Sequence, residues 1–141
     1  MRTGRARILI VDDEPDILLM LRVNLEAEGY LTLLAGDGET ALRRIGEERP
    51  DVVLLDIMMP VVDGWGVLER LATMDPRPRV ILLTAKSSGH DFNKARELGA
   101  DEYVTKPFDP DVLLNTIDSV LRTRAGDRDR SRIQPVYTTD D

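Results

Sequence analysis

The sequence DVVLLD at residues 51–56 sets four consecutive apolar residues between two aspartates. Short runs of Val, Ile and Leu bounded by Asp, Pro or Gly are typical of strands that are buried on both faces of a parallel sheet. The same character recurs at residues 8–11, 31–35 and 80–83, and more weakly at residues 102–104. We therefore predict five short, buried strands.

Helical patterns fill the intervals between these runs. Apolar residues recur three and four positions apart in residues 17–25, 41–45, 67–71, 95–98 and 112–121. Pro15 suits a first helical position after an aspartate cap, and Gly29 and Gly99 suit the left-handed residue that ends a helix. Asp109 and Pro110 mark the start of the last helix. Five helices therefore alternate with the five strands.

This alternation predicts an α/β fold, a doubly wound five-stranded parallel sheet with helices on both faces. A closed eight-stranded barrel needs about 250 residues, and the chain has 141. We expect one domain over residues 1–123. Residues 124–141 mix arginine with aspartate and offer little to bury, so we expect a disordered polar tail or linker there.

Composition excludes several kinds of site. The net charge is -7, from 19 basic and 26 acidic residues, which argues against a nucleic-acid-binding surface. The absence of cysteine excludes disulfides, thiolate nucleophiles and cysteine metal sites. The apolar run after the basic N-terminus is shorter than the ~7 residues of a signal peptide or the ~20 of a membrane span. We therefore expect a cytoplasmic protein that does not bind membranes.

Polar residues gather where the predicted strands end. Asp12, Asp13, Asp56, Thr84 and Lys106 each follow a strand, and ligands of open parallel sheets bind beyond these carboxyl ends. Two carboxylates 4 Å apart repel by about 4 kcal/mol at an effective dielectric near 20. A hard divalent cation relieves this repulsion, and Mg²⁺ prefers such oxygen ligands. The sequence thus predicts a magnesium site.

Asp56 is the candidate nucleophile of this edge. It ends a strand expected to be central, and a carboxylate held beside a metal can attack phosphorus to form an aspartyl phosphate. Thr84 and Lys106 are placed to bind the phosphoryl oxygens. Taken singly, Asp12 and Asp13 also suit helix caps, and Lys106 also suits a solvated surface charge. Their combination favours the functional interpretation.

Four motifs carry a resemblance to a known family: ILIVDDEPD, DVVLLDIMMPVVDG, VILLTAK and GADEYVTKPF. In this order and spacing they resemble the receiver domain of bacterial two-component response regulators, over residues 7–122. The resemblance implies a flavodoxin-like, CheY-like sheet with strand order 2-1-3-4-5.

The resemblance also implies a metal site. Asp56 accepts the phosphoryl group, Asp13 and the backbone carbonyl of Met58 join it on Mg²⁺, with Mn²⁺ as a substitute, and Asp12 acts through water. The Met58 side chain varies within the family and is a candidate modulator of the phosphoryl lifetime.

The remaining roles follow from the same resemblance. Thr84 and Lys106 bind the phosphoryl group, Tyr103 is the aromatic switch residue, and the bond to Pro107 is cis. A half-buried packing role is the alternative for Tyr103. Lys86 is a second candidate modulator of the phosphoryl lifetime.

We therefore expect a signalling switch rather than a dedicated enzyme. It takes phosphate from a histidine kinase or a histidine phosphotransfer protein. It then changes a protein-binding face made by the fourth helix, fifth strand and fifth helix, with phosphorylation-dependent homodimerisation as an expectation of the family. We expect a single-domain regulator without DNA-binding output.

Two alternatives belong to other classes. A metal-dependent phosphatase forming an aspartyl phosphate lacks support, because Met58 occupies the position where a second acid is needed. A flavin-binding electron carrier on the same fold is disfavoured, because Asp12, Asp13 and Glu14 repel a flavin phosphate. Phosphomonoester turnover tests the first, and the colour of the purified protein tests the second.

Overall fold

Strands and helices alternate along the chain, in a computed structural model that describes residues 5–59, 63–85, 89–122 and 135–136. The elements are β1 (Arg7–Val11), α1 (Pro15–Ala27), β2 (Leu31–Ala35), α2 (Gly38–Glu48), β3 (Val52–Asp56), α3 (Gly64–Leu71), β4 (Arg79–Thr84), α4 (Gly89–Glu97), β5 (Glu102–Thr105), α5 (Pro110–Arg122) and β6 (Pro135–Val136). No helix within these ranges combines the length and apolar character that crossing a bilayer requires.

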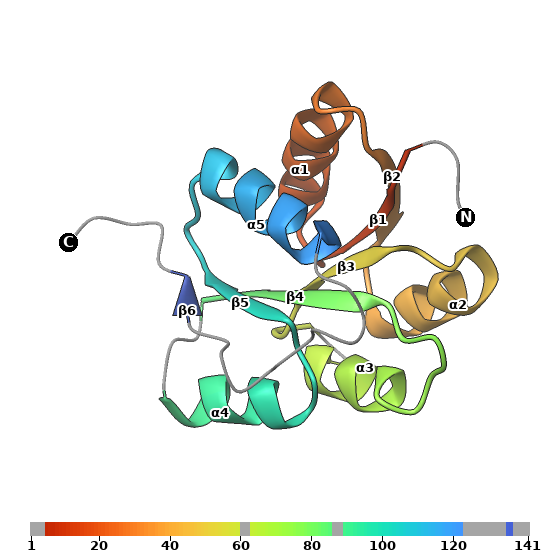
Figure 1. The fold of residues 1–141 in the computed structure, drawn as a ribbon, viewed down its shortest axis with the longest axis vertical. Coiled ribbons are helices and arrows are strands. Elements are labelled where there is room, and N and C mark those ends of the chain that lie inside the picture. The colour runs from red at the N-terminus through yellow and green to blue at the C-terminus, as the bar shows by residue number, and fades with distance from the viewer. Residues whose placement is uncertain (1–4, 60–62, 86–88, 123–134, 137–141) are drawn as a thin grey trace.

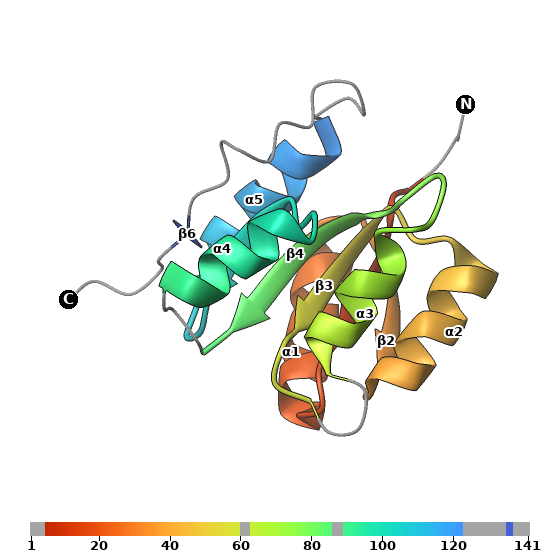
Figure 2. The ribbon, with the colours of Figure 1, turned by 90° about the horizontal axis from the view of Figure 1, so that it is seen from below.

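The strands form one parallel sheet in the order β2-β1-β3-β4-β5-β6. Helices α1 and α5 cover one face, and α2, α3 and α4 cover the other (Figures 1 and 2). The predicted doubly wound sheet with order 2-1-3-4-5 is confirmed. The two-residue strand β6 adds to it beside β5 and was not predicted. Apart from this strand, the predicted tail at residues 124–141 lies outside the described residues.

Two apolar layers flank the sheet because successive strand residues point to opposite faces. Leu9 and Val53 pack toward α2 and α3, whereas Ile8 and Leu54 pack toward α1 and α5. Every residue of β3 is buried. The uninterrupted apolar run in β3 is thus explained by its central place in the sheet.

The helix ends explain how the chain turns back from the strands. Gly29 and Gly99 have φ of 92° and 95°, as predicted for left-handed residues after α1 and α4. The predicted aspartate cap of α1 is wrong, because the N-cap is Glu14 and its side chain makes no capping hydrogen bond. Instead, Asp12 Oδ1 accepts a hydrogen bond from the backbone N–H of Glu14 at 2.9 Å. The Asp12 side chain is therefore held at the strand end.

Candidate functional site

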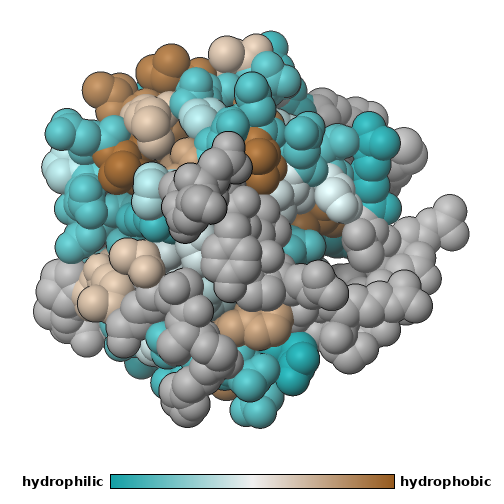
Figure 3. All heavy atoms as spheres, turned by 90° about the vertical axis from the view of Figure 1, so that its left-hand side faces the viewer, coloured by the Kyte–Doolittle hydropathy of each residue, from teal (hydrophilic) through white to brown (hydrophobic). Residues whose placement is uncertain are grey.

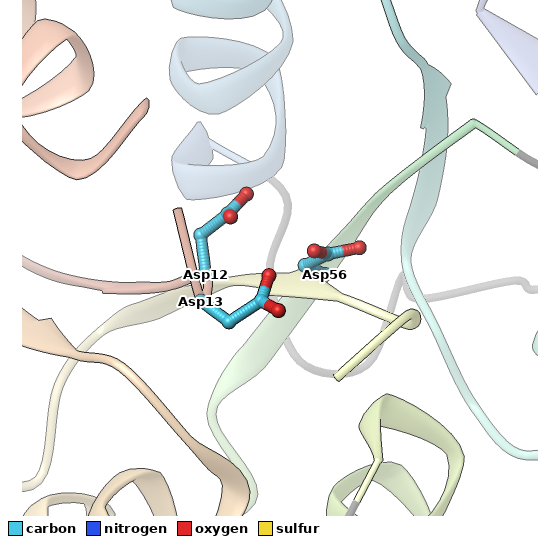
Figure 4. A group of neighbouring side chains, drawn as sticks. All are labelled: Asp12, Asp13 and Asp56. Atoms are coloured by element: carbon cyan, nitrogen blue, oxygen red, sulfur yellow. The ribbon is translucent and has the colours of Figure 1, made fainter. Parts of the chain in front are cut away.

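Three aspartates meet at the carboxyl edge of the sheet. In the parallel pair of β1 and β3, Val11 lies opposite Leu55, so the residues that follow emerge side by side. One oxygen each from Asp12, Asp13 and Asp56 lies within 4.8 Å of the others (Figure 4). Asp12 is 1% exposed and Asp56 is 3% exposed, whereas Asp13 is open to solvent. The register of the central strands therefore creates the acidic cluster.

Lys106 brings a positive charge to this cluster. Its Nζ lies 2.7 Å from Asp12 Oδ2 and 3.5 Å from Asp56 Oδ2. Burial lowers the pKa of Lys106, but its hydrogen bond and attraction to Asp12, with the attraction of Asp56, more than offset this and leave the pKa raised. The ammonium group therefore remains charged and bridges the two buried carboxylates.

The carboxyl group of Asp56 is in a strained electrostatic balance. Burial raises its pKa, and the negative charge of Asp12 raises it further. A hydrogen bond from the backbone N–H of Met58 to Asp56 Oδ1, at 3.0 Å, and the charge of Lys106 oppose this rise. Additional positive charge at this edge would therefore stabilise the ionised form that a nucleophile requires.

The donor set fits a hard divalent cation. Carboxylate oxygens are the ligands that Mg²⁺ prefers, together with water molecules, and the exposed position of Asp13 leaves that side open to solvent. The backbone of Met58 lies against the Asp56 carboxylate through its N–H, while its side chain is 53% exposed. The thioether of Met58 therefore points to solvent rather than occupying the core.

The fourth and fifth strands bring Thr84 and Lys106 to the same edge. Thr84 ends β4 and is completely buried, and its carbonyl accepts a hydrogen bond from the Lys106 backbone N–H at 2.8 Å. The peptide bond between Lys106 and Pro107 is cis, as the resemblance implied. Lys86, the other predicted modulator, lies outside the described residues.

Tyr103 does not join the acidic cluster. It belongs to the apolar layer on the α2, α3 and α4 side and is 0% exposed, so the alternative of a half-buried packing residue is wrong about its burial. Its ring meets that of Phe92 edge-on, with 5.8 Å between the centroids and an interplanar angle of 84°. Tyr103 therefore connects β5 to α4 rather than to the carboxylates.

Gly64 is a site residue that the sequence analysis missed. A Cβ atom at this position would lie 2.5 Å from both the Asp56 carbonyl oxygen and the Ile57 Cα. The Gly64 N–H also donates to the Ile57 carbonyl at 3.0 Å. The signal was present in the motif DVVLLDIMMPVVDG, whose final glycine begins the helix that returns to the acceptor strand. Only glycine allows this close approach.

Known proteins share this fold and these motifs. The family described as "Response regulator receiver domain" matches residues 8–118. The alkaline phosphatase synthesis transcriptional regulatory protein PhoP of Bacillus subtilis is 41% identical over 116 residues, which are 82% of this chain and 48% of that protein. The DNA-binding response regulator MtrA of Mycolicibacterium smegmatis is 43% identical over 122 residues, 86% of this chain and 53% of that protein. This chain spans about half the length of these two relatives.

A solved structure gives the same result. The CheY-like response regulator receiver domain protein of Methanospirillum hungatei has a TM-score of 0.80 and 34% sequence identity, covering 84% of this chain and 94% of that one. The matched family region contains both the acidic cluster and Lys106. This chain belongs to the response regulator receiver domain family.

Proposed function

We propose that this protein accepts a phosphoryl group on Asp56, in a Mg²⁺-dependent reaction, from a histidine kinase or a histidine phosphotransfer protein. The observation that carries the proposal is the arrangement around Asp56. Its buried carboxylate lies beside Asp12 and Asp13, with Lys106 Nζ 3.5 Å away. Such a site supplies the positioning and charge neutralisation on which phosphoryl transfer depends.

The proposed reaction assigns a task to each side chain. A carboxylate oxygen of Asp56 attacks the phosphorus atom of a phosphohistidine. The P–N bond breaks, and the imidazole nitrogen keeps the electron pair and takes a proton from solvent. Asp13, Asp56 and the Met58 carbonyl hold Mg²⁺, with Asp12 acting through water. When bound, the metal neutralises charge on the carboxylate and phosphoryl oxygens.

Lys106 and Thr84 bind the product. The Lys106 ammonium lies between Asp12 and Asp56, so a short movement brings it from the Asp12 carboxylate to a phosphoryl oxygen. The Thr84 hydroxyl donates to a second oxygen. These new contacts favour one arrangement of β4, β5 and the helices beside them, and Tyr103 transmits the change as the aromatic switch. Met58 and Lys86 tune how long the phosphoryl group remains.

The proposed output is a protein–protein contact through α4, β5 and α5. The described side chains on that side of the molecule include hydrophobic groups set among hydrophilic ones (Figure 3). A mixed surface of this kind is typical of protein interfaces. A downstream protein or a second phosphorylated copy of this chain is the proposed partner.

The proposal covers the receiver and its chemistry. The names of PhoP and MtrA assign transcriptional regulation and DNA binding to proteins about twice as long, and the shared part is the receiver. For this chain we propose a phosphoacceptor signalling domain of the cytoplasm that catalyses its own phosphorylation and dephosphorylation, not a dedicated enzyme. It acts through protein contacts and not through DNA.

Intact mass after incubation with acetyl phosphate tests the acceptor. We expect one added phosphoryl group on the wild-type chain in the presence of Mg²⁺, none without the metal and none on Asp56→Asn. Asp51→Asn is the matched control, because it makes the same change at the other end of the same strand and should be phosphorylated normally. Beryllofluoride binding by calorimetry serves where the adduct is short-lived. No adduct and no beryllofluoride binding would overturn the proposal.

A further inference from the structure

Helix α4 is held to the rest of the molecule by a small set of contacts that include two aromatic rings. Ala95 of α4 is fully buried, and Phe92 packs edge-on against Tyr103 of β5. On the side facing α3, the Lys94 ammonium lies 4.6 Å from the centroid of the Trp65 ring. A cation at this distance over an indole face is attracted by the ring. Lys94 and Trp65 therefore join α4 to α3.

The first turn of α3, in turn, lies directly against the acceptor. Gly64 precedes Trp65 and approaches the backbone of Asp56 and Ile57 too closely for any side chain. Asp63 caps the same turn, since its side chain accepts a hydrogen bond from the Gly66 N–H at 3.0 Å. Movement of the backbone that follows Asp56 would therefore move Trp65 with it.

These two observations form a continuous connection from the acceptor to α4. It runs from the Asp56 backbone through Gly64 to Trp65 and across the ring to Lys94 (α3 and α4 in Figures 1 and 2). It is separate from the connection through Thr84 and Tyr103, because it uses no residue of β4 or β5.

We propose that the contact between Lys94 and Trp65 stabilises the arrangement seen here, in which Lys106 pairs with Asp12, and so opposes the change that phosphorylation produces. This inference rests on the proposed function. Binding equilibria are reciprocal, so a contact that is weaker in the phosphoryl-bound form must also weaken binding of the phosphoryl group or its mimic. Lys94 is thus a positioning residue that sets the threshold of the switch.

The test compares beryllofluoride affinity among full-length variants by calorimetry in saturating Mg²⁺. Lys94→Met removes the cation and keeps an unbranched side chain, and we expect it to raise the affinity about threefold, the size of one exposed cation–π contact. Lys94→Arg keeps a cation over the ring and should bind like the wild type. Arg43→Met on α2 removes an equal charge far from this contact, because Arg43 pairs with Glu47.

The direction of the change separates the proposal from a simple charge effect. Loss of a positive charge weakens binding of an anion, so Arg43→Met should leave the affinity unchanged or lower it. An increase in Lys94→Met alone supports the proposal, and an unchanged or lower affinity in that variant overturns it. An equal increase in Lys94→Arg also overturns it.

Fluorescence provides an independent readout, because Trp65 is the only tryptophan. Beryllofluoride should shift the Trp65 emission in the wild type as the cation leaves the ring, and the shift should be smaller in Lys94→Met. An equal shift in both overturns the inference alone. If the wild type fails to bind beryllofluoride, the proposed function fails, and the inference falls with it.

Discussion

Both ends of the sheet place aspartates beside strands, yet they use them differently. At the amino edge, Asp51 Oδ2 accepts a hydrogen bond from the Arg7 N–H and Asp101 Oδ2 accepts one from the Val80 N–H, each at 2.8 Å. At the carboxyl edge, Asp12 and Asp56 lie beside each other and share the cation of Lys106.

The difference shows what turns a strand-end aspartate into a site. The amino-edge carboxylates each tie the backbone of a neighbouring strand, so they fix how the strands align. The carboxyl-edge carboxylates converge, so each raises the cost of charging the other, and Asp56 has a raised pKa through burial and then the charge of Asp12. Convergence, rather than the residue type, provides the capacity to bind a metal and a phosphoryl group.

Removal of the cation should have the largest effect. Lys106→Met leaves the buried Asp12 and Asp56 without their charge partner, and losing one member of a buried ionic group costs about 3 kcal/mol. We expect this loss in urea unfolding without metal, and a smaller loss in saturating Mg²⁺, which binds only the folded chain. Arg22→Met, in an exposed pair with Glu26, is the control and should cost below about 0.5 kcal/mol. Equal losses would contradict the special role of the carboxyl edge.

A side chain at Gly64 should disturb the carboxyl edge through its backbone. Gly64→Ala places a Cβ 2.5 Å from the Asp56 carbonyl oxygen, and such overpacking costs about 2 kcal/mol. Phosphorylation by acetyl phosphate should fall as well. Gly46→Ala in α2 is the matched control, since nothing lies within 4 Å of its added Cβ, and it should stabilise the protein by about 0.5 kcal/mol. Normal phosphorylation of Gly64→Ala would show that the close approach is dispensable.

At the amino edge, Asp101→Ala should affect stability alone. It leaves the Val80 N–H without its carboxylate acceptor, which costs about 1.5 kcal/mol. Thermal unfolding measures this loss, and intact mass measures phosphorylation, which we expect to equal that of the wild type. A marked fall in phosphorylation would mean that the two edges are not independent.

The smallest effect concerns pH and Glu102, which begins β5 beside Asp101. Burial, followed by the charge of Asp101, raises the pKa of Glu102 to about 7. The folded chain therefore holds a proton that the unfolded chain releases near its ordinary pKa of 4.5, so stability falls as the pH rises from there through 7. After allowance for solvent screening, Glu102→Gln should remove a loss on the order of 1 kcal/mol. Urea unfolding at acidic and alkaline pH measures it. A wild-type stability that does not fall over this range would refute the buried, protonated glutamate.

Much of the fold was predictable from local pattern. The runs at residues 31–35 and 52–55 gave strands in the right places because a parallel strand covered on both faces must be apolar throughout. The cap of α1 was not predictable, since Asp12, Asp13 and Glu14 are all acceptable there by residue type. Which of them serves depends on where β1 delivers the chain.

The sequence by itself determined the alternation of strands and helices, the acidic motif and its place after the strands, because these depend on residue order and hydrophobic pattern. Only the tertiary structure decided which aspartates converge. Val11 lies opposite Leu55, so Asp12 meets Asp56, whereas Asp51 and Asp101 each meet a backbone N–H. It also decided that Lys106, 94 residues after Asp12, neutralises the pair and that Lys94 reaches Trp65. Such contacts depend on the packing of strands and helices that are distant in sequence, which local pattern does not encode.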